Sequence, residues 1–109
     1  MLFEVISPDG EVVAEVNCDS DNEVYEMTIF PGKKDYPWEM ECLLKRGITR
    51  PDSDIVKLYL RCRVYPQDRQ NIGEILQDMG LDHYTIDGQL KVMQGRNMFD
   101  DFTMRVKEK

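Results

Sequence analysis

The sequence contains few of the residues that catalysis or metal binding needs. His83 is the only histidine, and the three cysteines, Cys18, Cys42 and Cys62, are 20 or more residues apart. Zinc sites usually need closely spaced Cys or His residues, and a Cys–His nucleophile needs both side chains in contact and a third group to orient them. The chain also has no glycine-rich phosphate loop. We therefore predict no metal site, no cofactor and no enzymatic activity.

Carboxylates are the chemically active groups that the chain has in excess, and they are concentrated near its start. Residues 1–42 hold eleven acids and two bases, whereas residues 43–109 hold ten acids and twelve bases. A strand-rich segment with this charge presents a negative surface, which attracts a basic partner protein. The alternative is a solvated acidic face that only aids solubility. The candidate partner-binding residues are Glu4, Glu11, Glu15, Asp19, Asp21, Glu23 and Glu26.

A second constellation lies in the later part of the chain, where basic and acidic residues alternate. Arginines of this kind bind a phosphate or carboxylate, or they pair internally with acids of the same chain. Both interpretations stay open, and the first would make the chain a small ligand-binding protein or enzyme. The candidate ligand cluster is Arg63, Arg69, Arg96, Asp100 and Asp101.

The same region resembles part of other bacterial proteins. The order of residues between Arg63 and Asp101 resembles a pattern found in small uncharacterised bacterial proteins, some of them carried by mobile elements. The matching residues are the run Arg63-Val64-Tyr65-Pro66-Gln67-Asp68-Arg69-Gln70-Asn71-Ile72 on to Leu81, then Tyr84, Gly95-Arg96 and Asp100-Asp101. The resemblance implies a bacterial cytoplasmic accessory protein and brings no activity or cofactor with it. In size and acidity the chain is also similar to phage and plasmid inhibitors of host defence, such as anti-CRISPR and anti-restriction proteins.

Composition is consistent with a binding protein. The 109 residues are 41% hydrophobic and 32% charged, which is typical of one globular domain spanning 1–109. The net charge of −7 argues against direct binding of nucleic acid. No stretch is apolar enough to cross a membrane, and an odd number of cysteines without a dense framework favours reduced thiols in the cytoplasm.

These observations predict a small acidic, non-enzymatic protein that binds a basic partner. An inhibitor of a nucleic-acid-handling bacterial defence enzyme, acting by charge mimicry, fits that description. A third interpretation is an assembly subunit, which exposed apolar residues such as Trp38 and Phe99 would favour. The choice between monomer and homodimer stays open.

The elements that would position these residues begin with strands. Residues 3–6 and 12–16 are β-branched runs around Ser7-Pro8-Asp9-Gly10, which predicts a hairpin with a glycine bulge. A two-residue turn is disfavoured because it would place Glu4 opposite Glu15. After a turn at 19–22, residues 23–30 alternate as a half-buried strand.

The rest of the chain mixes helices and strands. Residues 37–46 predict a short helix, and the alternation in 55–65 predicts a long strand with Cys62 facing the core. A helix beginning at Pro66 carries Ile72, Ile75, Leu76 and Met79 at helical spacing. We prefer a helix over a hairpin for residues 85–94, and 102–106 predict a last strand. The order β-β-β-α-β-α-α-β indicates an α+β fold with a mainly antiparallel sheet and helices on one face.

Overall fold

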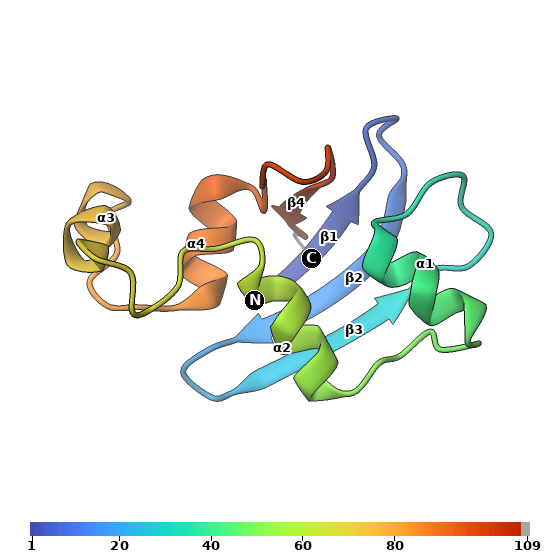
Figure 1. Cartoon of the computed structure of the whole chain (residues 1–109), viewed down its shortest axis with the longest axis horizontal. Helices are drawn as coiled ribbons and strands as arrows, with labels where there is room; N and C mark the ends of the chain where they lie inside the picture. The colour runs from blue at the N-terminus through green and yellow to red at the C-terminus, as the bar shows by residue number, and fades with distance from the viewer. Residues whose placement is uncertain (108–109) are drawn as a thin grey trace.

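The computed structural model describes residues 1–107 and has an α+β fold, as the sequence predicts. Four antiparallel strands form one open sheet in the order β3-β2-β1-β4. Figure 1 shows α1 and α2 lying across one face of this sheet, α4 beside them, and α3 beyond α4 and away from the strands. The elements are β1 (Leu2–Ile6), β2 (Val12–Asp19), β3 (Val24–Ile29), α1 (Trp38–Lys45), α2 (Ser53–Arg61), α3 (Ile72–Asp78), α4 (Ile86–Met93) and β4 (Thr103–Val106).

The β1–β2 hairpin has the predicted turn but not the predicted register. Gly10 has φ +86°, its N–H donates to the Ser7 carbonyl, and the Ser7 N–H donates to the Glu11 carbonyl. This is a tight turn closed by a left-handed glycine, a conformation that any Cβ would strain. A second irregularity between Val5 and Ile6 then shifts the pairing by one residue, so Glu4 does lie opposite Glu15. The expectation that like charges would disfavour this pairing was wrong, because Arg105 pairs with Glu4 and Lys107 pairs with Glu15.

The core lies between the sheet and the helices. Alternate residues of all four strands point toward α1, α2 and α4, and Phe3, Val5, Val16 and Met104 are almost completely buried there. The opposite face carries the charged residues of the sheet, including Glu4, Glu15, Glu26 and Arg105, together with apolar residues such as Leu2 and Ile6. The sheet is thus covered on one side only, as expected for an antiparallel sheet with alternating residues.

Residues 53–61 form helix α2, so the prediction of a strand over 55–65 was wrong. Val56, Tyr59, Leu60 and Arg63 are buried, and their spacing of three, four and seven residues is that of a helix. Asp52 begins the helix by accepting the Ile55 N–H at 3.0 Å, the usual role of an aspartate at this position. Because the chain is helical here, Cys62 is exposed rather than in the core.

The other helices follow the sequence prediction with one change. Helix α3 begins at Ile72 and not at Pro66, because Asn71 has φ +67° and interrupts the helical backbone. Its end is as predicted, with the Leu81 N–H folding back to the Leu76 carbonyl. Residues 86–93 are helical, and the Thr85 hydroxyl accepts the Gly88 N–H at 3.2 Å. The helix interpretation of this segment is confirmed.

Candidate functional site

Two of the candidate acids lie on the open face of the sheet and are neutralised there. Glu4 accepts a hydrogen bond from Arg105 Nε at 3.0 Å, and Glu15 lies 3.1 Å from Lys107 Nζ. Both cations come from the C-terminal strand or the residue just after it, so they pair with residues about 100 positions earlier in the chain. This side of the sheet is therefore a surface of alternating charges and not a purely acidic one.

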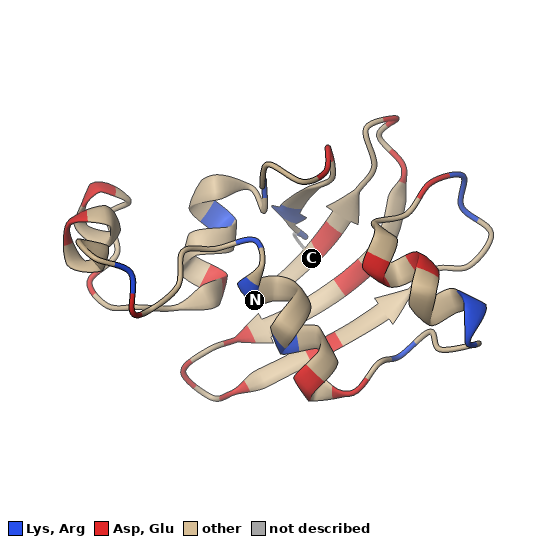
Figure 2. Cartoon of the chain, in the orientation of Figure 1, with Lys and Arg blue, Asp and Glu red and all other residues tan. Residues whose placement is uncertain are grey.

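The remaining candidate acids divide between the two ends of β2. Glu11 precedes the strand and accepts the Lys34 N–H, whereas Asp19 ends the strand. At a rise of about 3.3 Å per residue, an eight-residue strand separates them by roughly 25 Å. Glu26 lies on β3 and accepts a hydrogen bond from Asn17 on the open face. The seven acids therefore do not form one continuous patch (Figure 2).

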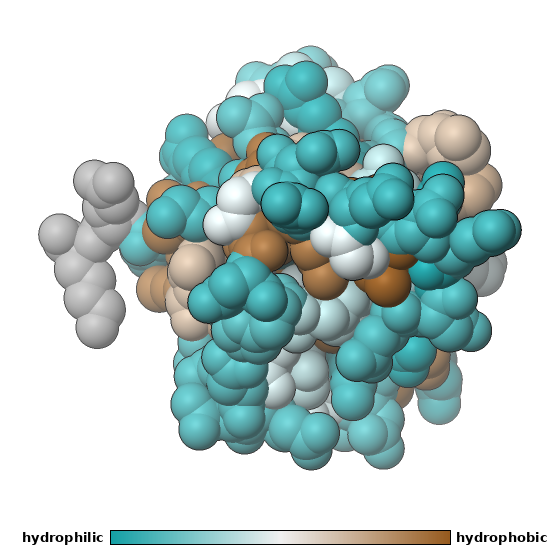
Figure 3. All heavy atoms as spheres, turned by 90° about the vertical axis from the view of Figure 1, so that its left-hand side faces the viewer, coloured by the Kyte–Doolittle hydropathy of each residue, from teal (hydrophilic) through white to brown (hydrophobic). Residues whose placement is uncertain are grey.

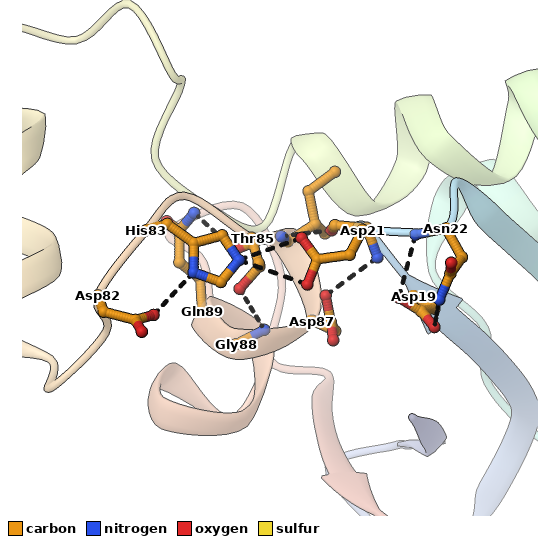
Figure 4. A network of polar contacts seen from close by, with 11 residues as sticks. Asp19, Asp21, Asn22, Asp82, His83, Thr85, Asp87, Gly88 and Gln89 are labelled. Carbon is orange, nitrogen blue, oxygen red and sulfur yellow. Dashed lines mark hydrogen bonds and ion pairs between the residues drawn. The ribbon is translucent and has the colours of Figure 1, made fainter.

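One group of carboxylates does come together, at the end of the molecule where the β2–β3 loop meets the start of α4. The Ser20 N–H donates to Asp87 Oδ1 at 3.2 Å, and the Ile86 N–H donates to the Ser20 hydroxyl at 2.7 Å. His83 then bridges the two segments, with Nε2 3.1 Å from Asp21 and Nδ1 2.7 Å from Asp82 (Figure 4). We call this group the acidic corner, and its carboxylates are Asp19, Asp21, Glu23, Asp82 and Asp87.

The hydrogen bonds of the acidic corner favour the charged forms of its groups. Asn22 donates to Asp19 and lowers the pKa of that carboxyl, and His83 lowers the pKa of Asp82 in the same way. The hydrogen bond to Asp82, followed by that to Asp21, raises the pKa of His83 above its usual 6.5. Asp19 and Asp82 are at the surface, so the corner presents at least these two charged carboxylates to solvent.

The candidate ligand cluster is divided between an internal ion pair and the surface. Arg63 is only 1% exposed, lies 2.5 Å from Asp100, and donates to the carbonyls of Gly95 and Phe102. Its guanidinium also lies 5.0 Å from the centre of the Tyr59 ring. Both terminal nitrogens of Arg63 are thus bound inside the protein, whereas its buried Nε has no hydrogen-bond partner among the described residues. This arrangement agrees with internal pairing of this arginine.

The other members of the cluster do not converge on Arg63. Arg69 stacks on the Tyr65 ring at 4.8 Å, whereas Arg96 and Asp101 are exposed beside Asp100 in a surface depression. Gly95, the residue before Arg96, packs closely against Met104. A Cβ on residue 95 would lie 2.6 Å from the Met104 side chain, and the φ of +63° at this residue also favours glycine. The arrangement holds the loop before β4 in place, and it offers no common centre to one ligand.

Two hollows involve residues that the sequence analysis did not group together. A polar cleft of about 260 Å³ lies beside the acidic corner, where Glu23 and Ser20 face Lys57 and Arg61 of α2. An apolar groove of about 300 Å³ lies between α1 and α2. Both hollows are lined by residues of helix α2. The sequence analysis predicted a strand in this segment and therefore did not predict either hollow. Seen from the α3 end, the surface is mostly hydrophilic, with apolar side chains set back between polar ones (Figure 3).

Within residues 1–107, no group of three or more His, Cys, Asp or Glu side chains is arranged to hold a metal ion. In the same part of the chain, no helix has the length and apolar character needed to cross a bilayer. Compared with known proteins, the chain matches no family model, no curated protein and no solved structure.

Proposed function

We propose that this chain is a non-enzymatic binding protein whose acidic corner docks against a basic surface of a partner protein. The observation that carries the proposal is the meeting of two segments, 19–23 and 82–87, that are about 60 residues apart in sequence. They bring five carboxylates to one corner of the molecule. His83 bridges the two segments by contacting Asp21 and Asp82 (Figure 4). Three of these five, Asp19, Asp21 and Glu23, belong to the set expected from sequence.

The corner is suited to electrostatic docking because its hydrogen bonds hold it in place before a partner arrives. The β2–β3 loop is tied to the start of α4 by two hydrogen bonds, from the Ser20 N–H to the Asp87 carboxylate and from the Ile86 N–H to the Ser20 hydroxyl. A fixed array of charges loses little conformational entropy on binding, and exposed charges also accelerate association. Glu4 and Glu15 contribute little to this attraction because Arg105 and Lys107 compensate them.

A bacterial enzyme that handles nucleic acid is the partner class that we favour. Such an enzyme has a basic path that neutralises phosphates, and a cluster of carboxylates competes for the same cations. The proposal places the chain in a bacterial cytoplasm as an inhibitor, in keeping with its resemblance to proteins of mobile elements. Three free cysteines suit a reducing compartment. Direct nucleic-acid binding is not proposed, because phosphates would be repelled.

The test compares two variants with the same change in charge. In the first, Asp21→Lys, Glu23→Lys and Asp82→Lys reverse exposed acids of the corner. In the control, Asp9→Lys, Asp35→Lys and Glu41→Lys reverse three exposed acids that lie outside it.

Each tagged chain is used to capture proteins from a bacterial lysate at low salt, and the captured proteins are identified by mass spectrometry. We expect a basic protein to be retained by the wild type and the control and lost by the corner variant, while all three chains melt at similar temperatures. Equal retention by both variants, or no retained protein with the wild type, would contradict the proposal.

A further inference from the structure

The apolar groove between α1 and α2 is lined mainly by apolar side chains of these two helices. Its floor contains buried core residues such as Met40 and Val56. Its rim carries Trp38, which is 72% exposed, and Leu58, which is 63% exposed. Large apolar side chains around a hollow are a common feature of interaction sites, and tryptophan is prominent among residues that dominate binding energy.

The chain also carries an apolar projection. Met98 is 89% exposed and Phe99 is 82% exposed, in the loop between α4 and β4. The loop is held firmly, because Asn97 accepts the N–H groups of Phe99 and Asp100, and Asp100 pairs with buried Arg63. Two exposed apolar side chains on a fixed loop form a preorganised anchor, which binds with less loss of entropy than a mobile one.

Charges around the projection complement those around the groove. Glu39 and Arg46 line the groove, and neither forms an ion pair within residues 1–107. Arg96 and Asp101 flank the Met98–Phe99 tip and are likewise exposed without an ion pair in that part of the chain. An acid and a base on each side allow two opposite-charge contacts when the tip enters the groove, which fixes its orientation.

We propose that the occupant of the groove is a second copy of this chain, whose Met98 and Phe99 enter it. Within one molecule both side chains stay exposed, so the tip does not fill its own groove. The groove includes Met27 of β3, whereas the tip leads into β4 at the other edge of the sheet. The exchange is reciprocal, with each copy giving a tip and receiving one. Such a reciprocal exchange gives a closed symmetric dimer, and none of the residues that it uses belongs to the acidic corner.

The first test measures the dimer dissociation constant by sedimentation equilibrium over a range of concentrations. Phe99→Ser and Trp38→Ser change exposed residues, so both variants are expected to fold. Val92→Ser is the matched control, because Val92 is 48% exposed on α4 and lines neither surface. We expect each of the first two to weaken dimerisation by roughly tenfold or more, and the control to leave it within about twofold. A monomeric wild type, or a dimer unaffected by Phe99→Ser, would overturn the proposal.

The second test uses the cysteines of the groove. Cys42 and Cys62 line it, and a Met98→Cys tip would reach them in the partner copy. Oxidation by diamide, which takes up the two electrons and two protons of the thiol pair, should then trap a covalent dimer. The trap should fail when Cys42 and Cys62 are both replaced by Ser. The control variant Gln77→Cys, exposed on α3, should give no dimer that depends on those two cysteines.

The same variants also show whether the groove binds a small apolar ligand in place of a second copy. If the wild type is monomeric and the dye anilinonaphthalene sulfonate binds it in a manner lost with Trp38→Ser, the groove takes a small apolar ligand and the proposed dimer is wrong. Because none of these variants alters the acidic corner, their outcome is independent of the proposed function.

Discussion

Asp100 and Arg63 form an ion pair of 2.5 Å that joins the end of α2 to the loop before β4. The guanidinium is 1% exposed, so it depends on this carboxylate and on two backbone carbonyls for all its charge compensation. The pair fixes the loop that carries Met98 and Phe99, and this loop is the tip that we propose enters the groove of a second copy. Its importance is structural, because the guanidinium is buried and a ligand in solvent does not reach it.

Removing the carboxylate should therefore destabilise the protein strongly. We expect Asp100→Ala to lower the free energy of unfolding by about 3–5 kcal/mol, because it leaves a buried cation without its partner. Asp101→Ala alters the exposed neighbour and should cost no more than about 0.5 kcal/mol. Urea unfolding of the two variants measures the difference. Similar values for both would show that the ion pair does not hold the loop.

The helical state of α2 predicts opposite behaviour for two leucines that a strand would place on the same face. Leu60 is completely buried, and we expect Leu60→Ala to cost about 2–5 kcal/mol. Leu58 is mostly exposed, so Leu58→Ala should change the free energy of unfolding by no more than about 0.5 kcal/mol. Urea unfolding at a low protein concentration separates the two cases. Equal losses would favour the strand.

Local signals were sufficient for the first three strands and the first turn, but not for the register of β1 against β2. Pro8 and Gly10 specify the first turn by their own backbone preferences, and the alternation in 23–30 has only one explanation. Residues 55–65 are ambiguous because Val56 and Leu60 fit both periods. The signal that decides between them is Asp52, a helix-starting residue just before the segment. Weighing that residue against the β-branched pattern would have indicated the helix.

The candidate site was less accessible from sequence because it is made by long-range contacts. The residues around Asp21 in the sequence do not indicate that His83 will contact it. Those around Glu4 do not indicate that Arg105 will pair with it. The excess of acidic residues in the early part of the chain was therefore predictable from sequence. The surfaces on which those residues lie were not. Trp38 and Phe99 were recognised as apolar residues suited to association, whereas the groove depends on how α1 and α2 pack.

His83 gives the acidic corner a dependence on pH. Its pKa is raised in the folded state by Asp82 and Asp21, so the imidazolium stabilises the fold. That contribution is complete below pH 6.5, the usual value, and is lost as the pH rises through the folded pKa. We expect NMR titration to place the His83 pKa above 6.5 and Asp82→Asn to lower it. A value unchanged by Asp82→Asn would show that the hydrogen bond is absent in solution.

The cysteines should differ widely in reactivity. Burial raises the pKa of the Cys18 thiol to about 12, and its side chain is inaccessible inside the sheet. Cys62 is exposed and Cys42 is partly so. We expect iodoacetamide to modify Cys62 first and Cys42 next, and to reach Cys18 only after unfolding, because the thiolate is the reacting form. Peptide mass spectrometry over time measures this order. Early modification of Cys18 would contradict its position in the core.

The most direct test of the proposed function is the affinity of the captured partner as a function of salt concentration. Titration calorimetry of the wild type should give a Kd that weakens steadily as sodium chloride rises, because exposed charges are screened. The variant Asp21→Lys/Glu23→Lys/Asp82→Lys should bind far more weakly at low salt. An affinity that stays constant across the salt range and is equal for both chains would contradict docking through the acidic corner.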